Sequence, residues 1–138
     1  MWSSTHEGRT SATPVRVYAL FSDVTTWPNW NAGVASIDID GPFVAGATAR
    51  MTFPDGSQLP FSITWAEPGV GYEDLTVVPD MGVEVRVRHE VMAVASGSVI
   101  TYRCDVHGAS DEVCAEVGRQ VSEDFDEVIT ALGDAAAQ

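Results

Sequence analysis

The sequence predicts an α+β fold in which a curved antiparallel sheet of six to seven strands wraps around one long C-terminal helix. Two short helices are expected after the first strand. Apolar and polar residues alternate in a series of segments between residues 34 and 107, which is typical of strands with one buried face. Short turns rich in Gly and Pro separate these segments, so consecutive strands should pair antiparallel. From about residue 112 the apolar residues recur every three or four positions, which is typical of an amphipathic helix.

The first elements have recognisable boundaries. Residues 1–9 are polar with a weak alternation, which is compatible with an edge strand. Thr13 can cap a helix, and Pro14 suits its first position because the missing N–H of proline is not needed there. Apolar residues follow at helical spacing, namely Val17, Leu20, Phe21 and Val24. Thr26 can cap a second helix, which the turn-forming segment 27–31 keeps short.

The strands are predicted from an alternation with a period of two. The expected segments are 34–40, 47–53, 58–67, 72–78, 83–91 and 100–107. The pattern is clearest in two of them, where the inward set is Val83, Val85, Val87, His89 and Val91, followed by Ile100, Tyr102, Cys104 and Val106. On the opposite face, Arg86 and Arg88 should pair with Glu84 and Glu90 across neighbouring strands in solvent.

The final element covers the apolar face of the sheet. Ser110 can cap a helix that runs to about Leu132, and residues 133–138 are expected to lie past its end. Its apolar stripe consists of Val113, Val117, Val121, Phe125, Val128 and Leu132. No other element is long enough to cover the sheet, so residues 1–138 are expected to form a single domain.

The composition excludes several classes of partner. There are 20 acidic side chains against 7 basic ones, all arginine, and the net charge of −13 repels nucleic acids and anionic membrane surfaces. No apolar stretch approaches the ~20 residues of a membrane helix, and no basic region precedes an apolar run as in a signal peptide. Cys104 and Cys114 are expected to be free thiols in a reducing compartment, with no metal-ligand spacing. These features favour a cytoplasmic protein.

Several segments point to one family. They are 14–24 with 27–31 (Trp-Pro-Asn-Trp-Asn), the break at Gly41-Pro42-Phe43 and Gly46, Arg88-His89-Glu90, and 97–102. In these segments and in its order of elements, the chain resembles the polyketide cyclase/dehydrase branch of the START-like (helix-grip, SRPBCC) superfamily. The resemblance implies a bacterial protein without a cofactor. It does not by itself select a function, because the superfamily includes lipid carriers, cyclases and hormone receptors.

A ligand cavity is expected between the concave face of the sheet and the long helix. Its aromatic walls would come from Trp27, Trp30, Phe61 and Trp65, and its other lining from Ile63, Val87, Cys104, Val117, Val121 and Phe125. His89 and Tyr102 are the polar inward pair, which an antiparallel hairpin can bring together. They would either orient a ligand or act as an acid–base pair, whereas the alternative is that His89 is a neutral packing residue.

Three functions follow from this cavity. The first is binding or transport of a hydrophobic small molecule such as a lipid, a quinone or a polyketide-like ring. The second is a polyketide cyclase or dehydratase that uses His89 and Tyr102. The superfamily's aromatic cyclases carry an Arg on a middle strand, which segment 58–67 lacks, and Arg50 would face inward only if its strand had the opposite parity. The third is a non-catalytic interaction domain that forms a homodimer.

Overall fold

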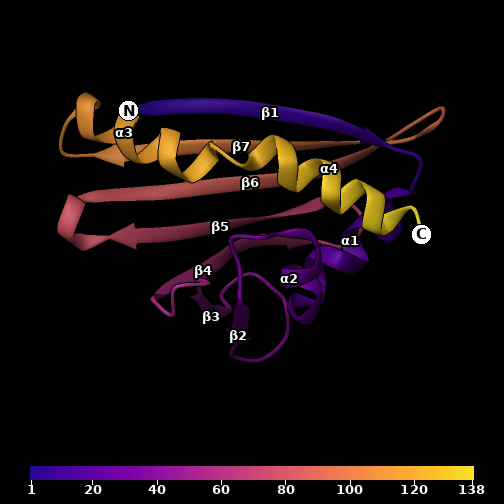
Figure 1. Ribbon diagram of the computed structural model, residues 1–138, viewed down its shortest axis with the longest axis horizontal. Helices are drawn as coiled ribbons and strands as arrows, with labels where there is room; N and C mark the ends of the chain where they lie inside the picture. The colour runs from indigo at the N-terminus through magenta and orange to yellow at the C-terminus, as the bar shows by residue number, and fades with distance from the viewer.

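Seven strands form one antiparallel sheet in the computed structural model, which describes residues 1–138. Their order is β1-β7-β6-β5-β4-β3-β2. The strands are β1 (Trp2–Thr10), β2 (Ser36–Ile39), β3 (Thr48–Thr52), β4 (Gln58–Glu67), β5 (Gly71–Val78), β6 (Val83–Val94) and β7 (Gly97–Gly108). The C-terminal helices lie along one face of this sheet (Figure 1). The predicted α+β helix-grip architecture is therefore confirmed.

The longest hairpin, β6–β7, sets the register at the centre of the sheet. Val87 lies opposite Cys104, and His89 lies opposite Tyr102. Because directly opposed residues in an antiparallel pair point to the same face, the two polar side chains predicted to meet do lie side by side. β1 pairs with β7 along its whole length and forms the edge strand on that side of the sheet.

The C-terminal helix runs from Asp111 to Ala136 with an interruption. It consists of α3 (Asp111–Ser122) and α4 (Phe125–Ala136). The hydroxyl of Ser122 donates a hydrogen bond of 2.7 Å to the carbonyl of Gly118, a back-bond that often bends helices. The prediction of one long C-terminal helix is confirmed, although residues 123–124 interrupt it. Its predicted end near Leu132 is wrong, since the helix continues to Ala136.

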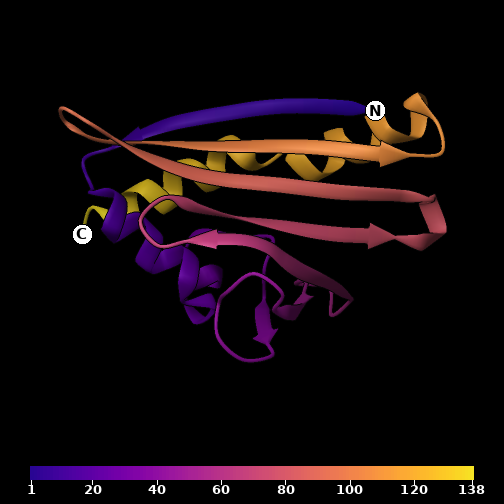
Figure 2. The ribbon, with the colours of Figure 1, turned by 180° about the vertical axis from the view of Figure 1, so that it is seen from behind.

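Short helices close one end of the sheet (Figure 2). They are α1 (Pro14–Ser22), the 3₁₀ turn η1 (Val24–Thr26) and α2 (Trp27–Trp30). Thr13 caps α1 as predicted, because its hydroxyl accepts a hydrogen bond from the Arg16 amide. The indole N–H of Trp27 donates to the carbonyl of Phe21 at 3.0 Å. This bond holds α2 against α1 and directs the Trp27 ring toward the sheet.

A β-bulge in β4 changes the predicted direction of Trp65. The register with β5 shifts between Ile63 and Trp65, so one extra residue reverses the alternation. Ile63 stays on the inner face, where it is buried, whereas Trp65 lies opposite Glu73 on the outer face. The guanidinium of Arg88 lies 4.0 Å from the centre of the Trp65 ring. The prediction that Trp65 forms an aromatic wall of the cavity is therefore wrong.

The outer face of the sheet carries a cluster of ion pairs whose partners differ in part from those predicted from the sequence. Glu73 of β5 is 8% exposed and accepts hydrogen bonds from Arg86 at 2.9 Å and from Arg88 at 2.8 Å. Arg88 also lies 3.3 Å from Glu90, as predicted. One nearly buried carboxylate thus joins two arginines, and Glu84 makes no ion pair. None of the helices is long and apolar enough to cross a membrane.

Candidate functional site

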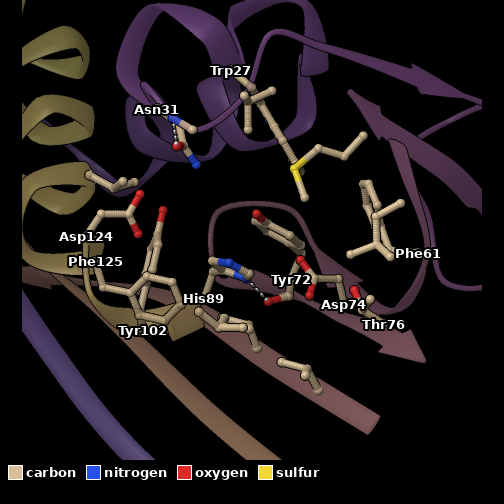
Figure 3. A pocket seen from close by; sticks show the side chains of 18 of the residues that line it. Trp27, Asn31, Phe61, Tyr72, Asp74, Thr76, His89, Tyr102, Asp124 and Phe125 are labelled. Carbon is tan, nitrogen blue, oxygen red and sulfur yellow. Dashed lines mark hydrogen bonds between the residues drawn. The ribbon is translucent and has the colours of Figure 1, made fainter. Parts of the chain in front are cut away.

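A cavity of about 210 Å³ lies between the concave face of the sheet, α2 and the break between α3 and α4. Most of its lining is apolar, with aromatic rings from Trp27, Phe61 and Tyr72 (Figure 3). The lining comes from β3 to β7, from α2 and from both segments of the C-terminal helix, so parts of the chain far apart in the sequence form it. The interruption of the C-terminal helix contributes Val121 and Phe125. Small-molecule sites favour such apolar concavities with few polar groups.

The structure places most of the predicted lining residues around this cavity. Those that line it are Trp27, Trp30, Phe61, Val87, His89, Tyr102, Val121 and Phe125. Ile63, Cys104 and Val117 do not line it but belong to the hydrophobic core. α3 packs directly on β1 and β7, so Cys104 and Val117 fill the space between these elements. Both cysteines are free and buried.

His89 is a neutral, tightly packed side chain. It is 6% exposed, its ring stacks on Tyr72 with centroids 4.0 Å apart, and the Tyr102 ring meets it edge-on at 4.4 Å. Burial lowers the pKa of His89 to about 3. Its Nδ1 lies 3.3 Å from the carbonyl of Tyr72. Since a carbonyl only accepts, Nδ1 carries the proton and Nε2 is left as an acceptor without a partner.

The hydroxyls of Tyr72 and Tyr102 have no hydrogen-bond partner in the protein, although the two residues are only 2% and 3% exposed. No fully enclosed side-chain polar atom lacks a partner, so both hydroxyls keep some accessible surface. Both residues line the cavity, which is where this surface lies. Burial raises the pKa of each phenol, so both stay protonated and can donate a hydrogen bond to a ligand.

Asp74 is the main cavity residue that the sequence analysis missed. It lies on β5 between Tyr72 and Thr76, and all three side chains line the cavity (Figure 3). The Asp74 carboxyl makes no hydrogen bond and no ion pair. Burial, with a smaller contribution from Glu73, raises its pKa from 3.8 to about 7. The alternation Tyr72-Asp74-Thr76 contained this signal, but the strand was too weakly patterned to assign its faces.

A second carboxyl lies on the opposite side of the cavity (Figure 3). Asp124 occupies the break between the helical segments and is half-buried, and burial raises its pKa. It lies beside Asn31, whose side-chain oxygen accepts a hydrogen bond of 3.0 Å from the Gly33 amide. A Cβ at Gly33 would be 3.3 Å from the Asn31 oxygen and 3.5 Å from that of Asp124, so these three residues form one polar margin.

Solved structures share this architecture. No family model and no curated protein matches the sequence. Ara h 8.0201 superposes with a TM-score of 0.74 at 18% identity over 98% of this chain and 97% of its own. Norcoclaurine synthase from Thalictrum flavum, in complex with dopamine and hydroxybenzaldehyde, gives 0.74 at 16% identity over 96% and 84%. The chain has the helix-grip fold.

A two-domain protein belongs to the same set. The di-domain ARO/CYC StfQ from the steffimycin biosynthetic pathway gives a TM-score of 0.78 at 14% identity, over 97% of this chain and 50% of its own. This chain therefore spans half the length of StfQ. At such identities the similarity establishes the fold, and the chemistry has to come from the cavity itself.

The cavity offers hydrogen-bonding groups but no cation. Its lining contains two carboxyls, two phenols, a neutral imidazole, a hydroxyl and an amide, and no arginine. Arg50 is exposed on β3, so the parity assigned from the sequence is correct and this arginine points away from the interior. No group of three or more His, Cys, Asp or Glu side chains is placed to hold a metal ion. The arrangement can bind, orient and protonate or deprotonate a small ring.

Proposed function

We propose that the protein binds a small hydrophobic molecule of one or two rings in the cavity between the sheet and the helix break. The observation that carries this proposal is an apolar cavity lined by two phenols whose hydroxyls keep accessible surface and make no hydrogen bond within the protein. Buried polar groups are normally satisfied, so hydroxyls such as those of Tyr72 and Tyr102 are suited to bind a ligand or water. The apolar walls supply affinity, at roughly 25 cal/mol for each Å² removed from water.

The volume limits the size of the ligand. An apolar cavity of about 150 Å³ accommodates benzene, whereas pockets for drug-sized ligands run from about 300 to 1,000 Å³. The value of about 210 Å³ lies between them. Among the predicted ligand classes, a quinone or a compact aromatic ring fits this space, and a lipid with two acyl chains does not. The single-ring compounds in the norcoclaurine synthase complex support a ligand of this size.

Two substitutions at neighbouring positions of β5 test the proposal. Thr76 lines the cavity, whereas Val77 is 49% exposed on the outer face. Thr76→Phe should fill the cavity and weaken binding of 2-naphthol, followed by its fluorescence, by about tenfold or more. Val77→Phe adds the same ring outside and should leave the affinity unchanged. Equal affinities in both variants, or no binding by the wild type, would contradict the proposal.

A cyclase or dehydratase is the second candidate, and the grouping of ionisable side chains favours it. Asp74 has a pKa near neutrality, as suits a general base, and it lines the cavity together with Tyr72 and Tyr102. Burial raises the pKa of both phenols, and the charge of Asp74 contributes to both shifts. A phenol that donates to a ligand carbonyl while the carboxylate removes an adjacent proton would produce an enol. The solved structures of similar fold include the di-domain ARO/CYC protein StfQ, which fits this chemistry.

Proton exchange tests this second candidate without knowledge of the natural substrate. In D₂O the protein should accelerate deuterium incorporation next to the carbonyl of 2-tetralone, measured by NMR. Asp74→Asn and Tyr102→Phe should each remove the acceleration while 2-tetralone still binds. Exchange that is no faster than in the Asp74→Asn variant would show that the wild type binds the ring without transforming it.

A further inference from the structure

The charge of the cavity restricts the ligand further. This inference rests on the proposed function, since it concerns what occupies the same cavity. A carboxyl at an apolar wall loses hydration, and its charged form is disfavoured unless a donor or a cation replaces the water. Asp74 has neither in the protein. A ligand that brings a cationic donor to this position would satisfy the carboxylate.

No positive group is available for an anionic ligand. The two charged side chains of the lining, Asp74 and Asp124, are both acids. The chain has no lysine, and its net charge is −13. The arginines nearest in the sheet, Arg86 and Arg88, lie on the outer face, where both bind Glu73. Electrostatic attraction therefore favours a cation over a carboxylate of the same shape.

Aromatic rings surround the same part of the cavity. Trp27 stacks on Phe61 with centroids 6.1 Å apart and an interplanar angle of 17°. Its centroid is 5.9 Å from that of Tyr72, the residue that precedes Asp74 on the inner face of β5. Such faces attract an ammonium group and also stack with a ligand ring. We propose that the ligand is a small aromatic amine, whose protonated nitrogen binds Asp74 and whose ring packs among Trp27, Phe61 and Tyr72.

The pairing should depend on pH with a definite sign. Only the ionised form of Asp74 attracts the cation, so amine affinity should fall as the pH drops from 8 to 6. The titratable groups that face Asp74 across the cavity come from several elements: Tyr72 on the same strand, His89 on β6, Tyr102 on β7 and Asp124 at the helix break. Glu73 lies next to Asp74 in the sequence but on the outer face of the sheet. Between pH 6 and pH 8 the other titratable lining residues stay uncharged, because the phenols remain protonated and His89 remains neutral.

Three probes of one shape separate charge from ring binding. 1-Naphthylmethylamine, 1-naphthalenemethanol and 1-naphthoate should be titrated calorimetrically into the wild type at pH 8. The amine should bind at least about tenfold more tightly than the alcohol, the size of one charge-assisted hydrogen bond, and 1-naphthoate should bind most weakly. Asp74→Asn should remove the amine preference while the alcohol keeps its affinity within about threefold. Asp80→Asn, at an exposed aspartate without a side-chain partner, should change nothing.

The outcomes distinguish this inference from the function on which it rests. If amine and alcohol bind equally, if 1-naphthoate binds most tightly, or if Asp74→Asn keeps the preference, the amine assignment is wrong although the cavity binds rings. If no probe binds, the proposed function fails as well. The wild type alone gives a second reading that needs no variant, because the ratio of amine to alcohol affinity should fall between pH 8 and pH 6. A ratio that is constant over this range would overturn the role of Asp74, and the same titration of Asp124→Asn should retain the fall.

Discussion

Replacing Asp74 with Asn should stabilise the unliganded protein at neutral pH. The carboxyl lies at an apolar wall without a partner, and its pKa rises from 3.8 to about 7 in the fold. At ~1.4 kcal/mol for each tenfold change, that rise corresponds to at most about 4 kcal/mol of destabilisation above pH 7. Water that enters the cavity screens part of this cost, and the amide is itself polar. We therefore expect a gain of about 1–3 kcal/mol in the free energy of unfolding.

The dependence of this gain on pH identifies its cause. Between pH 4 and pH 7 the unfolded chain releases the Asp74 proton while the folded chain keeps it, so wild-type stability falls relative to the variant as the pH rises. Urea unfolding of both proteins at pH 4 and pH 8 measures this difference, with Asp80→Asn as the matched exposed control. The stabilisation should be nearly absent at pH 4 and complete at pH 8. A variant that is less stable than the wild type at pH 8, or a difference independent of pH, would show that the Asp74 carboxylate does not destabilise the fold.

Substitutions at three further positions, with Glu84→Ala as a control for one of them, test the packing around the site. Glu73→Ala should lower the free energy of unfolding, measured in urea, by about 2 kcal/mol because it leaves two arginines without their shared carboxylate. Glu84→Ala, the control, should lower it by less than about 0.5 kcal/mol because Glu84 makes no ion pair. His89→Ala should lower the free energy of unfolding by about 2–4 kcal/mol because it opens a void between two tyrosine rings. A decrease below about 1 kcal/mol would contradict the packed position of His89. Gly118→Ala should lower the melting temperature because the new Cβ would clash with the Trp2 ring, and an unchanged Tm would contradict this contact.

The acid sensitivity of the protein should carry a contribution from His89 of opposite sign to that of Asp74. The pKa of His89 falls from 6.5 to about 3 in the fold. The unfolded chain therefore binds a proton between these values that the folded chain does not, and stability is lost as the pH falls below 6.5. A wild type that loses no more stability than His89→Phe between pH 7 and pH 5 would contradict a neutral His89.

The long-range arrangement followed from the sequence where one periodicity dominated. The strict alternation through His89 and around Tyr102, joined by a short turn, was enough to predict their meeting, because antiparallel register follows from a tight hairpin. The helix that covers the sheet was predicted because apolar residues recur every three or four positions from Val113 to Leu132. A homodimer and a cytoplasmic location stay predictions, since both concern what lies outside one chain.

The features that the sequence did not predict correctly have local physical causes. A single bulge near Thr64 reversed the direction of Trp65, and a bulge leaves no clear mark in an alternating sequence. The C-terminal helix breaks after Ser122, whose hydroxyl bonds back to Gly118, although the apolar stripe runs on without a gap. The sequence analysis did not identify Asp74 because the alternation in segment 72–78 was too weak to assign its faces. Its inward direction depends on the register of β5 with β6, where Asp74 lies opposite Val87.

We propose that a small ring occupies the cavity between the sheet and the helix break. Intermolecular nuclear Overhauser effects between 2-naphthol and the protein test this position, because they identify the protons that touch the bound ring. We predict contacts to the Trp27 ring and to the methyl groups of Val87 and Val128, which approach the cavity from three different elements. Contacts confined to exposed apolar residues such as Val15 and Met92, with none to these three, would contradict the account.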